Sequence, residues 1–216
     1  MSFRSKTLRR IYRAPEIAAE KLFSWHRSMH FLQETKGTQT PISFRDWYRQ
    51  EVCGINRGPY WPVHTSSLVT GWRNVLAGIE TSPGAMPGCY VQAMGSVILG
   101  NYTQIGPNVS IISSNHKSED LRQHDIGRIE IGEYSWLGAG SVILPNVVLG
   151  PFTIVAAGAV VTKSLPEGYS VLAGVPAQVV KRLDPANCLK HRSPYEYHGF
   201  IPRAEFDAFR AKELLV

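Results

Sequence analysis

One histidine near the middle of the chain, His116, has both the chemistry and the position expected of a catalytic base. It follows Asn115 and opens a charged segment, residues 117–130, that also contains His124. A neutral imidazole accepts a proton near pH 7, so His116 is a candidate general base toward a hydroxyl group. Asn115 and His124 are weaker candidates for contacts with the substrate that carries this hydroxyl.

Basic side chains farther along the chain form a second candidate set. Lys163 follows Thr162 at the end of an apolar repeat, and Lys181 precedes Arg182. Ammonium and guanidinium groups bind anions, so these three residues are candidates for an anion contact. The alternative is that they are solvated turn residues. The histidines and cysteines lack the spacing of metal ligands, and no metal is expected.

The elements that must position these groups are predicted by an apolar repeat with a period of six. This period is typical of a hexapeptide β-helix, in which each hexad is one short strand and a turn, and three hexads close one coil. The glycines that follow five of the apolar positions are expected to supply freedom in φ at the corners. The nine repeat positions are Leu99, Ile105, Ile111, Ile131, Leu137, Ile143, Leu149, Val155 and Val161.

The repeat has one large interruption and a weak beginning. The step from Ile111 to Ile131 contains fourteen residues more than one hexad, which predicts a loop over 117–130 at a corner of the coil. Upstream, weaker residues keep the same phase and predict a degenerate first coil from about Val63, with an irregular corner over 82–88. These weaker positions are Val69, Val75, Pro87 and Ala93.

The chain of 216 residues is therefore divided into a basic helical extension (1–58), the β-helix (59–183) and a capping extension (184–216). The net charge is +6, and residues 1–30 supply five of these charges. That segment predicts an amphipathic helix after Pro15, with short helices also expected over 43–53 and from Pro202. The apolar residues of the first helix are Ala18, Leu22, Trp25, Met29 and Leu32.

The composition suggests a soluble protein of a reducing compartment. No apolar run reaches the length of a membrane span, and three cysteines without a framework pattern argue against disulfides. A cytoplasmic location is expected. The basic first helix either packs on the open end of the prism or contacts an anionic surface, such as the inner face of the membrane.

Several motifs resemble those of the hexapeptide-repeat acyltransferases, in particular the galactoside and maltose O-acetyltransferases. They are the repeat itself, Asn115-His116 at the start of an excursion, the run 131–138 and the ending Val161-Thr162-Lys163 followed by residues 173–177. The segment 115–124 is also similar to acetyltransferases of surface-polysaccharide clusters. The resemblance covers roughly residues 60–183.

This resemblance implies a mainly β protein with a left-handed parallel β-helix, assembled as a homotrimer that binds acetyl-CoA between adjacent prisms. It implies that His116 is the general base and that the backbone N–H of Ala139 faces the oxyanion of the tetrahedral intermediate. The remaining residues implied to contact CoA are Trp136, Ala157 and Thr162 along the pantetheine arm, and Lys163, Lys181 and Arg182 at the phosphates.

The expected activity is acetyl transfer from acetyl-CoA to a hydroxyl of a saccharide, either in a surface polysaccharide or in lipopolysaccharide. One alternative is N-acetylation of an amino nucleotide sugar or a xenobiotic. Another is a noncatalytic β-helical scaffold. A zinc carbonic anhydrase would need three converging histidines, which the spacing of His64, His116 and His124 does not provide.

Overall fold

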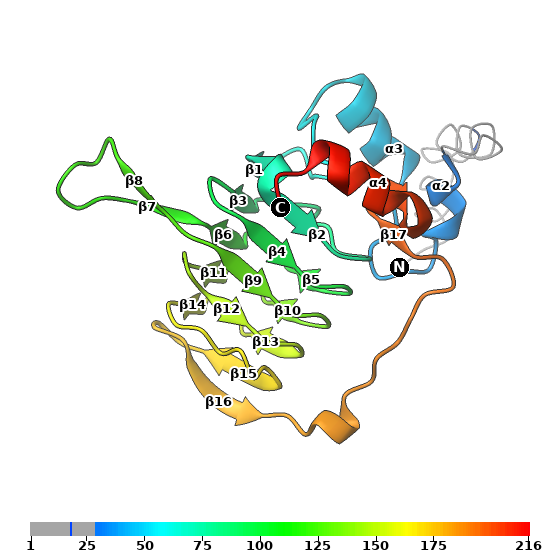
Figure 1. Ribbon diagram of the computed structural model, residues 1–216. Coiled ribbons are helices and arrows are strands. Elements are labelled where there is room, and N and C mark those ends of the chain that lie inside the picture. Colours follow the sequence, from blue (N-terminus) through cyan, green and yellow to red (C-terminus); the bar gives the residue numbers. More distant parts are fainter. Residues whose placement is uncertain (1–17, 19–28) are drawn as a thin grey trace, which may run out of the picture.

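The computed structural model describes residue 18 and residues 29–216, and its body is a prism with three walls of short parallel strands (Figure 1). Wall A contains β1 (Leu68–Thr70), β3 (Tyr90–Gln92), β6 (Ser110–Ile112), β11 (Val142–Ile143) and β14 (Val160–Val161). Wall B contains β2 (Val75–Ala77), β4 (Val97–Leu99), β9 (Ile129–Ile131) and β12 (Val148–Leu149). Wall C contains β5 (Gln104–Ile105), β10 (Trp136–Leu137), β13 (Thr153–Val155), β15 (Ser170–Ala173) and β16 (Gln178–Arg182).

The six-residue repeat is the core of this prism. Eight of its nine positions are at most 2% exposed, and the ninth, Ile105, packs against the same cluster. Repeat positions of the same wall stack on one another in successive coils, as Ile111, Ile143 and Val161 do in wall A. Small or β-branched residues that stand four positions after seven of the repeat positions are buried as well; they are Thr103, Val109, Ser135, Ser141, Val147, Thr153 and Ala159. The predicted parallel β-helix of stacked coils is therefore confirmed.

The glycines after the repeat positions are needed for close stacking, and the expectation that they supply freedom in φ is wrong. A Cβ on Gly132 would lie 2.4 Å from the backbone nitrogen of Pro151, and one on Gly100 would lie 2.4 Å from that of Glu133. Neither glycine has a left-handed φ. The left-handed residues of the corners come two positions later, for example Asn108 at 57°.

Upstream of Leu99 the strands do not keep the predicted phase. Val69 pairs with Val91, and Val91 with Ile111, so the stack skips Pro87 and Ala93. Ala93 is buried, but it lies just after β3, and Pro87 is exposed in the irregular segment between β2 and β3. The corner between β3 and β4 holds two more residues than a regular coil allows, which shifts the repeat.

The large interruption is a β-hairpin that projects away from the prism at the corner between walls A and B (Figure 1). Its strands are β7 (Ser114–His116) and β8 (His124–Ile126), which pair antiparallel. The predicted loop boundaries of 117–130 are too late at both ends. His116 belongs to the first strand of the hairpin, and Ile129 is already buried in wall B.

The segment before the prism forms short helices. The predicted helix over 43–53 is present as α3 (Phe44–Trp47), which continues into a π-helical turn (Tyr48–Val52) and is capped by the Ser43 hydroxyl accepting from the Asp46 N–H. The predicted first helix lies mostly outside the described residues. Of its apolar face, Met29 and Leu32 are buried around α2 (Phe31–Glu34).

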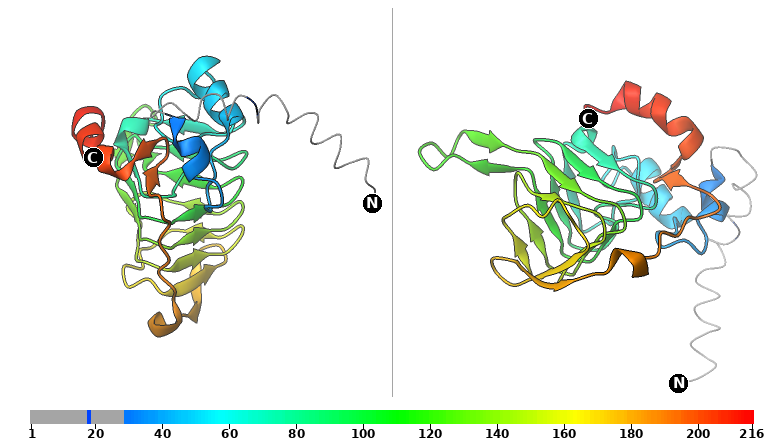
Figure 2. Two further views of the ribbon diagram at one scale, coloured as in Figure 1. Left: turned by 90° about the vertical axis from the view of Figure 1, so that its right-hand side faces the viewer. Right: turned by 60° about the horizontal axis from the view of Figure 1, so that its bottom comes forward.

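The carboxyl-terminal extension caps its own prism. After β16, which pairs antiparallel with β15, the chain runs back along the prism to the first coils (Figure 2). There β17 (Tyr197–His198) and β18 (Ile201–Pro202) lead into the predicted helix, α4 (Arg203–Glu213). Phe206 and Phe209 of α4 pack on Tyr60. In the described part of the chain, no helix is long and apolar enough to cross a membrane.

The returning segment lies over a ladder of stacked aromatic rings at the corner between walls B and C. Centroids of neighbouring rings are 4.9 to 5.2 Å apart, and all four residues have left-handed φ values of 45° to 59°. Such a conformation costs roughly 1–2 kcal/mol per residue. Stacking contributes about 0.5–1.5 kcal/mol per pair, which offsets much of that cost. The ladder consists of Tyr102, Tyr134, Phe152 and Tyr169.

Adjacent residues of β12 test whether stability depends on the inward positions. Leu149→Ala should lower the free energy of unfolding by about 2–5 kcal/mol, because Leu149 is fully packed and a cavity would remain. Val148 lies next to it, faces outward and is half-buried, so Val148→Ala should cost less than about 1 kcal/mol. Urea unfolding followed by circular dichroism measures both. Equal losses would contradict an interior built on the six-residue repeat.

Candidate active site

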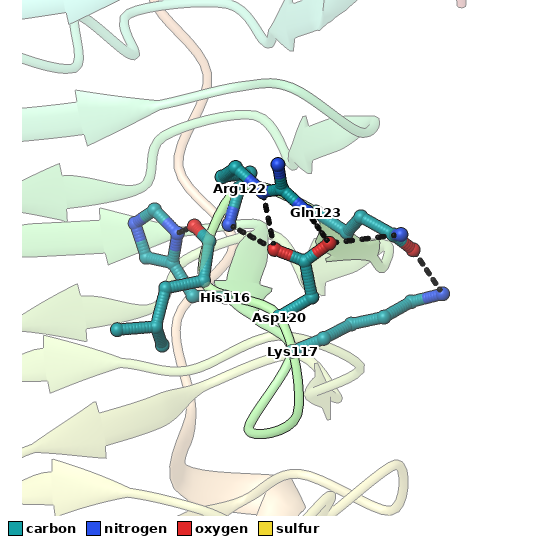
Figure 3. Close-up of polar contacts among 6 residues, drawn as sticks. His116, Lys117, Asp120, Arg122 and Gln123 are labelled. Atoms are coloured by element: carbon teal, nitrogen blue, oxygen red, sulfur yellow. Dashed lines mark hydrogen bonds and ion pairs between the residues drawn. The ribbon is translucent and has the colours of Figure 1, made fainter.

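His116 lies on the projecting hairpin with one ring nitrogen fixed by the backbone (Figure 3). Its Nδ1 is 2.5 Å from the carbonyl oxygen of Leu121. A carbonyl oxygen only accepts hydrogen bonds, so this contact assigns the proton to Nδ1 and leaves Nε2 with a free lone pair. The side chain is exposed, so Nε2 is accessible to a reacting hydroxyl.

The acidic residues of the hairpin do not hold this tautomer. Asp120 accepts hydrogen bonds from the Arg122 guanidinium at 2.8 and 3.0 Å and from the Arg122 backbone N–H (Figure 3). These hydrogen bonds hold the pKa of Asp120 below its usual value. The Asp120 carboxylate therefore orders the turn at the tip of the hairpin, and the backbone carbonyl of Leu121 orients His116.

The two histidines of the hairpin face each other. His116 and His124 are register partners of β7 and β8, and their ring centroids are 4.3 Å apart. Asn115 pairs with Asp125 at the next position, where side chains point to the other face of the hairpin. The structure thus brings His124 to His116 and directs Asn115 away from both.

The corner between walls C and A carries two backbone N–H groups that donate no hydrogen bond to any other described residue. They belong to Ala139 and Ala157, which occupy equivalent positions in successive coils and are exposed. The same position in the coil above is Pro107, which has no N–H. A position that accepts proline directs its N–H away from the coil, so Ala139 and Ala157 present donors to solvent.

The other predicted CoA residues lie on wall C and at the corner between walls A and B. Trp136 projects from the outer face of β10 and is 52% exposed. Thr162 and Lys163 are exposed just after β14, at the corner that bears the hairpin two coils earlier. At a coil spacing of roughly 4.8 Å, this separates them from the base of the hairpin by about 10 Å along the prism.

Lys181 and Arg182 lie on β16, the outermost strand of wall C. The Arg182 guanidinium is already engaged, since it pairs with Glu167 at 3.1 Å and donates to the Ser170 hydroxyl at 3.0 Å. Lys181 has no ion-pair partner among the described residues, and the same holds for Lys163. These two lysines are therefore better placed than Arg182 to meet a phosphate.

Within one chain the candidate groups form two separate sets at opposite edges of wall A. His116, His124 and Lys163 lie at its edge with wall B. Ala139 and Ala157 lie at its edge with wall C, beside the face that carries Trp136. The single prism does not bring the imidazole to the free N–H groups.

A cavity beside wall B contains none of these residues. It has a volume of about 1050 Å³ and lies between wall B and the carboxyl-terminal extension, where Leu76 and Ile98 face Tyr195 and His198. Among residue 18 and residues 29–216, no group of three or more His, Cys, Asp or Glu side chains is arranged to hold a metal ion.

The contact between His116 and the Leu121 carbonyl and the pairing of the two histidines are not predicted by the sequence analysis above. No pattern in residues 117–123 reveals which carbonyl turns toward the ring. The pairing had a signal, because the polar run around Asp120 can form a turn between two short strands that bring His116 opposite His124.

Comparisons with known proteins agree with a β-helix of hexapeptide repeats. Residues 128–163 match the family model described as bacterial transferase hexapeptide (six repeats). Galactoside O-acetyltransferase of Lactococcus lactis is 36% identical over 92 residues, which cover 41% of this chain and 44% of that protein. WbbJ of Escherichia coli K12, provisionally named a lipopolysaccharide biosynthesis O-acetyl transferase, is 32% identical over 106 residues, covering 43% of this chain and 54% of WbbJ.

A solved structure of galactoside acetyltransferase in complex with coenzyme A superposes with a TM-score of 0.57 at 20% identity, covering 83% of this chain and 88% of the other. In sequence, the chain spans about half the length of the curated relatives it matches. The repeat match implies the left-handed winding expected from the sequence. The predicted resemblance is confirmed, since residues 128–163 match the model of the bacterial transferase hexapeptide repeat and the β-helix has the fold of the solved galactoside acetyltransferase.

Proposed function

We propose that the protein transfers an acetyl group from acetyl-CoA to a hydroxyl group of a saccharide. The observation that carries this proposal is the fixed tautomer of His116, whose unprotonated Nε2 is exposed on the hairpin. The names of the relatives, galactoside O-acetyltransferase and a lipopolysaccharide O-acetyl transferase, support a saccharide acceptor and hydroxyl chemistry. The structure of the former with coenzyme A supports the donor.

In the proposed reaction His116 Nε2 accepts the proton of the acceptor hydroxyl as its oxygen attacks the thioester carbonyl. The carbonyl oxygen becomes negative, and the free N–H of Ala139 donates a hydrogen bond to it. Collapse of the tetrahedral intermediate breaks the C–S bond. The departing CoA thiolate takes the proton back from the His116 imidazolium, so that the ester and free CoA leave and the base is restored.

A trimer with three chains around one axis would bring together the two sets of candidate groups at the edges of wall A. If wall A faces the axis, its edge with wall B meets the neighbour's edge with wall C, which brings His116 of one chain to Ala139 of the next. The outer face of wall A supports this packing, because its central column is mostly apolar. That column runs through Leu68, Tyr90, Ser110, Val142 and Val160.

The CoA arm would then lie along wall C. Trp136 offers an exposed aromatic face to the pantetheine, with the Ala157 N–H and Thr162 as polar contacts. Lys163 and Lys181 would meet the phosphates, with Arg182 as a further donor if it leaves Glu167. The saccharide would lie against the face of the hairpin that carries His116, opposite to the face that carries Asn115. The basic amino-terminal segment would bind an anionic membrane surface, where a lipid-linked acceptor would be located.

Replacing the base tests the chemistry. His116→Ala should lower kcat by about 10²–10⁴-fold with little change in the KM for acetyl-CoA, because proton removal stabilises only the transition state. Release of free thiol with a panel of methyl hexosides measures the rate. His64→Ala is the matched control, since His64 is also a prism histidine and its ring forms hydrogen bonds to nearby Ser66, away from the hairpin. Near-parent turnover in His116→Ala would identify another group as the base.

The trimer is tested by one substitution on each of two walls. Light scattering of the parent should give three times the 24.0 kDa of one chain. Val142→Glu should yield folded monomers, because a charge would be buried against the neighbouring wall A. Val148 is the same residue type at the same outward position of wall B, and Val148→Glu should remain trimeric. A monomeric parent at micromolar concentration would refute the assembly.

The phosphate contact is tested through Lys163. Lys163→Ala should raise the KM for acetyl-CoA several-fold at unchanged kcat, because the phosphates are remote from the reacting carbon. The effect should shrink in high salt, since screening weakens an exposed ion pair. Lys212→Ala, an exposed lysine on α4, is the control. Acetylated pantetheine lacks the nucleotide phosphates. If its KM differs between parent and mutant as much as the KM for acetyl-CoA does, Lys163 does not bind phosphate.

A further inference from the structure

We propose that His124 is a positioning residue whose ring holds the imidazole of His116 in its reactive orientation. The proposal rests on the proposed role of His116 as the base. His124 packs against His116 across the hairpin, so we assign it a positioning role and not a second role in proton transfer.

The position of the hairpin creates the need for such a residue. β7 and β8 project from the prism, and both register partners at their outer end are histidines. His116 is exposed there, beyond the stacked core that immobilises the apolar repeat. An exposed imidazole rotates about two side-chain torsions, and a general base that rotates away from the reacting hydroxyl loses rate.

Two contacts restrict this rotation, and they act on different parts of the ring. The Leu121 carbonyl holds Nδ1 at 2.5 Å and so fixes the direction of one edge. The His124 ring packs against His116 with centroids 4.3 Å apart and planes inclined by 43°. The hydrogen bond alone allows the ring to tilt about the N–O line, and the neighbouring ring blocks that tilt. Together the two contacts leave Nε2 pointing in one direction.

The strand register makes the second contact specific. Side chains of directly opposed residues in an antiparallel pair lie close together, whereas the next residues point to the other face. Asp125 therefore cannot substitute for His124, although it is adjacent in the chain and opposes Asn115. A ring at position 124 is required by this geometry, and a second titratable group is not.

The experiment compares His124→Ala with His124→Phe, using Asp125→Ala as the control from the opposite face of the same strand. His124→Ala should lower kcat by about 10- to 100-fold with unchanged KM for acetyl-CoA and for the methyl hexoside that the parent acetylates fastest. His124→Phe should recover most of the lost kcat, since it restores a ring of similar size. Asp125→Ala should behave as the parent.

A spectroscopic measurement separates this proposal from the proposed function. Carbon-13 relaxation NMR of the histidine rings should show a restricted His116 ring in the parent and in His124→Phe and a more mobile ring in His124→Ala, while the Nδ1–H tautomer, which the Leu121 carbonyl sets, stays the same in all three. This holds whether or not His116 is the base, and full turnover of His116→Ala would overturn only the proposed function. Parent-like kcat and parent-like ring motion in His124→Ala would overturn the positioning role. Equal inactivity of the Ala and Phe variants, or a matching loss in Asp125→Ala, would also overturn it.

Discussion

The structure depends on the close stacking of one coil upon the next. Each hexad contributes only two or three residues to a strand, too few to be stable alone, so every strand relies on in-register partners above and below. The stack is tight enough that a single Cβ at Gly132 or Gly150 would meet the backbone of the next coil within 2.5 Å. Apolar positions must therefore recur every six residues, and extra chain can leave only at a corner.

The two ends of such a stack need separate protection, because each would otherwise expose a row of unpaired backbone groups. At the last coil, β16 turns back and pairs antiparallel with β15, so that no further coil can add in parallel. At the first coil, Phe206 and Phe209 of α4 cover Tyr60. The segment that joins the two ends lies over the aromatic ladder, where the Tyr134 hydroxyl donates to the carbonyl oxygen of His191.

The rigid prism also explains why the candidate chemistry lies on its edges. Walls built from short strands offer flat faces, whereas corners offer free N–H groups and room for an insertion. Ala139 and Ala157 provide free N–H groups at one edge of wall A. The inserted hairpin with His116 lies at the other edge. In the proposed reaction the complete site requires a neighbouring copy of the chain, so that assembly and activity are coupled.

The amino-acid sequence predicts the architecture, since the six-residue repeat specifies stacked coils and each repeat position can be identified from its residue type. It also singled out His116, because one insertion in a regular repeat is visible without a structure. It could not place the first coils, where two extra residues before β4 shift the phase, nor show why glycine follows the repeat positions. Those depend on contacts between coils far apart in the chain. The tautomer of His116, its packing against His124, and the separation of the candidate groups across wall A were decided only by tertiary structure. They arise from the path of a turn, the register of a hairpin and the closure of a prism. The polar run around Asp120 indicates that a turn can form there, but no local residue pattern sets the path of that turn or the register of the two strands.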